Sequence, residues 1–185
     1  MEQYINIPDD RIGALIGQNS GVMKSLAERT GVEFSVDSEA GAVVVRSADD
    51  SVAAMRATEV VKAIALGFSQ QHAMRLLDDE DSVLDVVSLG SVASATPELT
   101  RLKGRIIGKD GLMRDAIEES TMVFVSVHGK TVALIGGLDG LQVAREALDM
   151  LVKGAPHQAV FNFLARKRSD FNQRGLDTLF PDAEP

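Results

Sequence analysis

The sequence predicts an α+β protein built from two tandem β-α-α-β-β-α units, each with a three-stranded sheet packed on helices. One observation is an internal repeat with an offset of 91 residues, which aligns 13–36 with 104–127. Another is that short alternating apolar runs, typical of strands, are followed by helical apolar stripes in the same order in both halves. The identical pairs in the repeat include Gly13 and Gly104, Ile16 and Ile107, Gly17 and Gly108, Glu28 and Glu119, Val32 and Val123, Ser35 and Ser126, and Val36 and Val127.

The first half opens with a strand that Pro8 stops. Pro8 with Asp9 and Asp10 is typical of a helix start, since proline suits the first helical position and carboxylates suit the positive end of the helix dipole. Gly31 is expected to end the second helix as a C′ residue. The expected elements are a strand over 3–7, helices over 8–16 and 22–30, strands over 32–36 and 42–46, and a helix over 51–66.

A linker helix over 68–77, with Ser69 as its N-cap, precedes the acidic run 78–81, which we interpret as a solvated connector. Pro156 begins a last helix, which we expect to end at Arg168. The second half is expected to contain a strand over 83–89, helices over 97–107 and 111–121, strands over 122–127 and 131–135, and a helix over 141–153. The expected domains are a first unit over 1–67, a linker helix over 68–81, a second unit over 82–154, a C-terminal helix over 155–171 and a flexible tail over 172–185.

Composition narrows the classes of protein. With 185 residues and 45% hydrophobic content the chain can bury a sizeable core, and at 4% aromatic content aliphatic side chains must fill it. The absence of cysteine excludes disulfides, thiol catalysis and cysteine-ligated metal. No apolar run could span a bilayer and no basic-then-apolar leader is present, so we expect a cytoplasmic protein. Three scattered histidines and the lack of a catalytic motif predict no metal, no cofactor and no enzymatic activity.

The centre of the repeat in the second half is the turn Gly108-Lys109-Asp110-Gly111. Its glycines remove side-chain bulk, so that another backbone can approach, and the helix expected to begin at about Asp110 directs its unpaired N–H groups and positive dipole end into that gap. Such a gap suits a phosphate, although GxxG is also an ordinary interhelix turn. Five cations surround the single anion Asp110 over 101–114, namely Arg101, Lys103, Arg105, Lys109 and Arg114.

The net charge of −8 counts against a nucleic-acid-binding protein in a simple interpretation, but a confined basic patch on an acidic body can steer a polyanion to one face. Arg166, Lys167 and Arg168 either extend a phosphate track or complement a helix end. The candidate apolar wall for bases beside the turn comprises Ile106, Ile107, Met113, Val123 and Val125.

The two copies of the turn are not equivalent. In the first, Gly17-Gln18-Asn19-Ser20, Gln18 stands where the second has Lys109, and Ser20 stands where it has Gly111. The first turn has therefore lost its second glycine and its charge. We interpret the first unit as a structural or protein-binding copy and its turn as a candidate secondary site for nucleic acid.

A helix–GxxG–helix–strand segment with a basic residue in the turn resembles the nucleic-acid-gripping centre of a KH domain. The segments IPDDRIGALIG, TGVEFSVDSEAGAVVV, VVKAIALGFSQQHAMRLLDD, RLKGRIIGKDG, SVHGKTVALIGG and VAREALDMLVKGAPH, with ARKR, together resemble the archaeal two-KH-domain small-subunit ribosome assembly factor of the partner-of-Nob, or Dim-two-like, family. The resemblance covers about residues 3–170.

The resemblance implies two type I KH domains, no catalysis, and binding of single-stranded RNA near the 3′ end of small-subunit rRNA. It implies three protein partners: the endonuclease that matures this end, the dimethyladenosine transferase and the α subunit of initiation factor two. By position it assigns the RNA clamp to Gly108, Lys109, Asp110 and Gly111, with Arg105 and Arg114 beside them; Lys103 and Ile107 complete the predicted site.

Two hypotheses follow from the sequence. The first is an RNA-binding assembly factor of rRNA processing that works through the second KH domain. The second is a scaffold that recruits rRNA-maturation enzymes or a translation initiation factor, with incidental contact to RNA.

Overall fold

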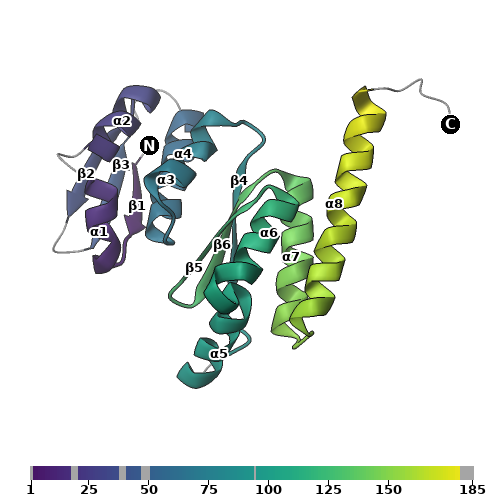
Figure 1. The fold of residues 1–185 in the computed structure, drawn as a ribbon. Helices are drawn as coiled ribbons and strands as arrows, with labels where there is room; N and C mark the ends of the chain where they lie inside the picture. Colours follow the sequence, from purple (N-terminus) through teal and green to yellow (C-terminus); the bar gives the residue numbers. More distant parts are fainter. Residues whose placement is uncertain (1, 18–20, 38–40, 47–50, 94, 180–185) are drawn as a thin grey trace. The chain divides into compact units, whose positions relative to one another are not determined.

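A computed structural model describes residues 2–17, 21–37, 41–46, 51–93 and 95–179 (Figure 1). The fold is α+β with two three-stranded sheets, as the sequence predicts, and its elements follow the predicted order. In the first half they are β1 (Glu2–Asn6), α1 (Asp9–Ile16), α2 (Gly21–Thr30), β2 (Glu33–Asp37), β3 (Ala42–Arg46), α3 (Ser51–Ala65) and α4 (Gln70–Asp78).

The first sheet has the order β1-β3-β2, with both pairs antiparallel. Val43 of the central strand lies opposite Ile5 and Val36, and Ile5 and Val43 are buried. Side chains alternate between the two faces of a strand, so this register places Ile5, Val43 and Val45 on the core side and leaves Tyr4 71% exposed. Val44, which lies opposite Tyr4, is half-buried on the other face.

The second half repeats the pattern. Its sheet has the order β4-β6-β5, the same order by position as the first. Its elements are β4 (Val83–Ser88), α5 (Thr96–Ile107), a 3₁₀ turn (Lys109–Gly111), α6 (Leu112–Thr121), β5 (Phe124–His128), β6 (Thr131–Gly136), α7 (Leu138–Val152) and α8 (His157–Leu179).

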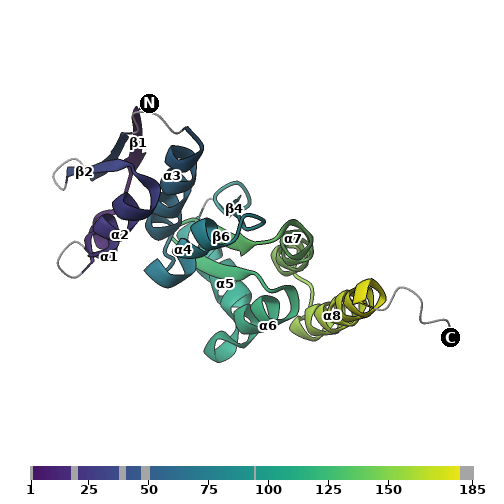
Figure 2. The same ribbon diagram turned by 90° about the horizontal axis from the view of Figure 1, so that it is seen from above.

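By its contacts the chain divides into two compact units. The first comprises Met1–Val87 with Ser126–Ile135, and the second comprises Ser88–Val125 with Gly136–Pro185. In the second unit α8 packs against α6 and α7, with Val160 and Leu164 buried, and Figures 1 and 2 show the three helices side by side. None of the helices in the described ranges is long and apolar enough to cross a membrane.

The C-terminal helix differs from its prediction. It was expected to end near Arg168 and to leave 172–185 as a flexible tail, yet α8 continues to Leu179. The next proline is Pro181, and Gly175 alone weakens the helical pattern after Arg168, at a cost of about 1 kcal/mol relative to alanine. A basic cluster is not a helix stop when no breaker follows it.

The acidic run after α4 is more than a solvated connector. Asp78 forms an ion pair with Arg29 of α2, with 2.6 Å between Oδ1 and Nη2. Asp79 accepts hydrogen bonds from the Ser82 hydroxyl at 2.9 Å and from the backbone N–H of Asp81 at 3.1 Å. These bonds, the Ser82 hydroxyl foremost, lower the pKa of Asp79 from its usual value of 3.8. The run therefore shapes the turn between α4 and β4.

Candidate nucleic-acid interface

The turn between α5 and α6 has a backbone that only glycine adopts readily. Gly108 has φ 76° and ψ 176°, a region almost exclusive to glycine, and Asp110 and Gly111 are both left-handed, with φ of 54° and 83°. The helix α6 begins at Leu112, one residue after the start of the expected range 111–121, because two left-handed residues come first. Lys109 and Asp110 are exposed at the tip, and no side chain caps the start of α6.

The space beside Gly108 is used by the chain itself. A Cβ placed on Gly108 would lie 2.7 Å from the Cβ and 2.8 Å from the backbone nitrogen of Met113. At Gly111 a Cβ would meet nothing nearer than Arg114 Nη2 at 3.4 Å, so the demand for glycine comes from its positive φ. The first glycine thus lets α6 pack against the end of α5, and the backbone that approaches Gly108 is that of Met113.

The same device occurs in the first repeat. Gly17 has φ 67° and ψ −176°, and a Cβ there would lie 2.5 Å from Cγ2 of Val22. Val22 and Met113 correspond at the offset of 91 residues, so the two glycines serve the same packing in both copies. The remaining candidates in the first turn, Gln18, Asn19 and Ser20, lie outside the described residues.

The predicted cations have different surroundings. Lys109 and Arg101 are exposed, and Lys103 is half-buried. Arg114 donates from Nε and Nη2 to Oδ1 of Asp115, at 3.2 and 3.0 Å, with both side chains more than 40% exposed. An ion pair this exposed contributes little to stability, so the Arg114 guanidinium can exchange Asp115 for another anion.

Arg105 is held by the fold. Its Nε donates to the carbonyl of Leu151 at 3.1 Å and its Nη2 donates to the carbonyl of Ala155 at 2.6 Å, in a partly buried setting. These carbonyls lie at and after the end of α7, where helical carbonyls lack partners within the helix. Arg105 therefore caps α7. Its contacts do not favour the expected role beside an RNA phosphate.

The first unit contains a matching arginine that the sequence did not single out. Arg11 of α1 donates from Nε to the carbonyl of Ile64 at 2.9 Å and from Nη2 to that of Phe68 at 2.6 Å. In each unit an arginine from the first helix thus binds two carbonyls four residues apart at the end of the third. Arg11 precedes Gly17 by six residues, whereas Arg105 precedes Gly108 by three, so the repeat alignment does not pair them.

Most of the candidate apolar wall is core. Ile106 and Met113 are fully buried, and Val123 and Val125 are at most 6% exposed. Ile107 is half-buried at the end of α5. The accessible apolar side chain beside the turn is one that sequence reasoning missed, Leu112, which is 59% exposed directly after Gly111. Its place just behind the GxxG turn was the signal that could have identified it.

The basic run lies within α8. Lys167 Nζ is 3.7 Å from Oε2 of Glu146 on α7 and 5.5 Å from the centre of the Phe163 ring, so it helps to hold α8 on α7. Arg166 and Arg168 are exposed. Because the helix continues past them, they do not complement a helix end. Within the described ranges no group of three carboxylate or histidine side chains could hold a metal ion.

Known sequences resemble this chain over most of its length. Residues 83–169 match the second KH domain of the PNO1 family, described as a eukaryotic type KH domain, type I. The KH domain-containing protein MJ0443 of Methanocaldococcus jannaschii is 40% identical over 169 residues, which are 90% of this chain and 74% of that protein. The pre-rRNA-processing protein PNO1 of Saccharomyces cerevisiae is 26% identical over 175 residues, 92% of this chain and 64% of that protein.

Solved structures of Dim2p are also similar to this chain. Dim2p from Pyrococcus horikoshii has a TM-score of 0.83 at 40% identity, covering 90% of this chain and 99% of that one. A chain of the a/eIF2alpha–aDim2p–rRNA complex from the same organism has a TM-score of 0.84 at 38% identity, covering 92% and 95%. Because the identity to MJ0443 extends over three quarters of that protein and the domain match includes the GxxG turn, this chain belongs to the Dim2/PNO1 family of KH-domain proteins.

Proposed function

We propose that this protein binds single-stranded RNA near the 3′ end of small-subunit rRNA, through its second KH domain, during rRNA processing and ribosome assembly. The observation that carries the proposal is the 108–111 turn, which presents Lys109 at an uncapped helix start. Support comes from relatives that are named as pre-rRNA-processing proteins and from a related chain solved in a complex with rRNA.

The chemistry of the turn suits the backbone phosphates of a single strand. Lys109 supplies a mobile charge, the start of α6 supplies backbone N–H groups, and Arg114 can exchange Asp115 for a phosphate oxygen. Leu112, and in part Ile107, offer aliphatic contact to a base beside the clamped backbone. Lys103 lies further back on α5, and Arg166 and Arg168 on α8 are candidates for secondary contacts.

The finer architecture belongs to the same proposal. We propose two tandem type I KH domains over 1–67 and 82–154, joined by the linker over 68–81, with the first serving as a structural or protein-binding copy. The protein acts without catalysis and in the cytoplasm. Its partners, by family resemblance, are the rRNA-maturing endonuclease, the dimethyladenosine transferase and the initiation factor two α subunit; the complex of a related chain with a/eIF2alpha supports the last.

The test is the affinity for single-stranded oligonucleotides of the rRNA 3′ end, measured by fluorescence anisotropy. Lys109→Asp should weaken binding about tenfold or more, because it replaces an attraction to phosphate with a repulsion. Lys153→Asp, the same charge change at the exposed end of α7, is the control and should change affinity less than threefold. Equal affinity of wild type and Lys109→Asp, with both folded, would reject the clamp.

A scaffold role is the second candidate, favoured by an apolar cavity in the first unit that is described below. Capture of partner proteins from nuclease-treated lysate distinguishes the two roles. Partners that stay bound after the RNA is digested favour the scaffold, and partners that are lost favour the RNA-binding role.

A further inference from the structure

The compact unit of residues 1–87 with 126–135 contains a cavity of about 570 Å³ that the RNA-binding proposal does not use. Its lining includes Ile5 of β1, Leu66 after α3, and Leu84 and Val86 of β4, and its exposed surface is almost entirely apolar. Its volume lies within the range of sites that hold small ligands or large side chains. Val86 is 43% exposed, so the apolar floor reaches solvent.

The charges around this cavity are unusual for so acidic a chain. The net charge is −8, yet no carboxylate is among the lining residues, whereas Lys62 and Lys130 are. Both lysines are exposed, and neither forms an ion pair within the part of the chain that the structure describes. The lining therefore carries two lysines above an aliphatic floor, and the nearby Asp10 carboxylate is paired with His128.

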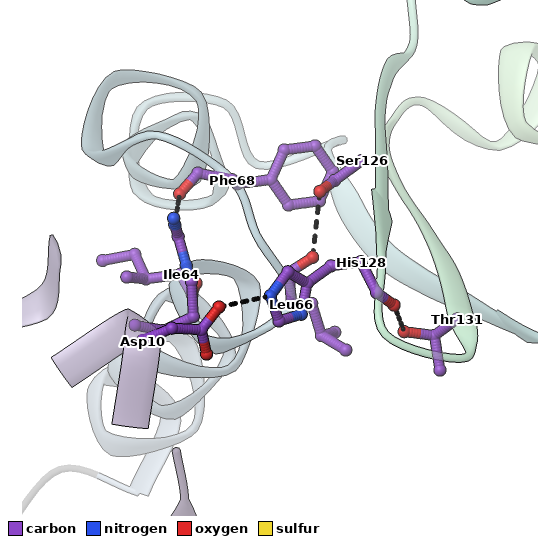
Figure 3. A network of polar contacts seen from close by, with 8 residues as sticks. Asp10, Ile64, Leu66, Phe68, Ser126, His128 and Thr131 are labelled. Carbon is purple, nitrogen blue, oxygen red and sulfur yellow. Dashed lines mark hydrogen bonds and ion pairs between the residues drawn. The ribbon is translucent and has the colours of Figure 1, made fainter. Parts of the chain in front are cut away.

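One wall of the cavity is fixed by a series of polar contacts (Figure 3). Nε2 of His128 lies 3.0 Å from Oδ2 of Asp10, the Ser126 hydroxyl donates to the carbonyl of Leu66 at 2.9 Å, and the Thr131 hydroxyl donates to the carbonyl of His128 at 3.0 Å. A Cβ on Gly67 would lie 2.6 Å from the Ser126 hydroxyl oxygen, so this approach requires glycine. These contacts preform the cavity.

The lining suits a peptide better than a nucleobase. The lining has no arginine on which a base could stack, and its one aromatic ring is that of His128, whose Nε2 is bonded to Asp10. An aliphatic floor matches a bulky apolar side chain, and lysines at the rim match carboxylates beside it. We infer that the cavity docks an acidic segment of a partner protein that inserts one or two large apolar side chains.

The probe is the acetylated, amidated octapeptide EEDFLDEE, titrated into the full chain while its methyl groups are followed by NMR. The inference expects shift changes at the methyl groups of Leu66, Leu84 and Val86. The double variant Lys62→Glu, Lys130→Glu should weaken binding about tenfold, because two attractions become repulsions. Lys24→Glu, the same change on the exposed face of α2, should leave affinity within twofold.

Two further probes make the result decisive. The peptides KKNFLNKK and EEDSGDEE, which reverse the flanking charge and remove the apolar pair, should each bind at least tenfold more weakly than EEDFLDEE. An oligo-uridine octamer should leave these methyl groups unshifted. The inference is overturned if EEDFLDEE does not shift them, if the double lysine variant binds it as tightly as wild type, or if the RNA occupies the cavity instead. Because Lys109 is untouched, these outcomes are independent of the RNA clamp.

Discussion

Substitution of Arg105 tests whether this residue stabilises the fold or contacts RNA. Its guanidinium makes two hydrogen bonds, to the carbonyls of Leu151 and Ala155, across 46 and 50 residues of chain. A hydrogen bond that involves a charged group contributes about 1.5–3 kcal/mol, and partial exposure favours the lower figure. Arg105→Ala should therefore lower the free energy of unfolding by about 2–3 kcal/mol, which for a chain of this size is a fall in Tm of roughly 5–10 °C.

The assay is urea unfolding followed by far-ultraviolet circular dichroism, with RNA affinity measured separately where every variant is folded. Arg101→Ala is the control, since Arg101 is exposed on the same helix, and it should change stability by less than about 0.5 kcal/mol. RNA affinity of Arg105→Ala should stay within about threefold of wild type. Unchanged stability together with a loss of RNA affinity as large as that of Lys109→Asp would show that Arg105 faces the RNA and that its capping bonds are weak.

Three other predictions concern the turn and the Asp10 contact. Gly108→Ala should destabilise the fold by about 3 kcal/mol or more in thermal unfolding, because a strained φ is combined with a clash against α6, whereas Gly111→Ala should cost about 1–2 kcal/mol from its φ alone; equal losses would contradict the packing argument. RNA affinity should fall with salt at a log–log slope of about 2 to 3.5, which corresponds to three to five released counterions, and a slope near zero would show that the contact is not electrostatic. The hydrogen bond from His128 lowers the pKa of Asp10 from 3.8, so this carboxylate favours the folded state above that pH and the benefit is lost as the pH falls through the lowered pKa. His128→Ala should return the Asp10 pKa toward 3.8 in an NMR titration of carboxyl carbons, and an unchanged midpoint would mean that the contact is absent in solution.

Local patterns in the sequence account for most of the fold. Short apolar runs identify the strands, and glycine at 17 and 108 marks the end of the first helix in both copies. The offset of 91 residues predicts that both sheets share one strand order, because identical element order with short connections permits few arrangements. A local pattern also predicts the candidate site, since the GxxG turn and its lysine can be recognised in the sequence.

What the sequence could not supply is which distant group each polar side chain meets. Arg105 and Lys109 look alike as neighbouring cations, yet one is bound to carbonyls at the end of α7 and the other is exposed. The length of α8 is a separate case. The basic residues 166–168 predicted its C-terminus, but the helix continues to Leu179 because no proline occurs between these residues and Pro181.

The sequence by itself therefore determined the elements, the repeat and the place of the candidate clamp, since each depends on residues within a few positions of one another. The tertiary structure alone decided that Arg11 and Arg105 cap helices and that a lysine-rimmed cavity forms in the compact unit of residues 1–87 with 126–135. The physical reason is that hydrogen-bond capture and cavity formation depend on the packing of segments about 50 or more residues apart, which periodicity does not encode.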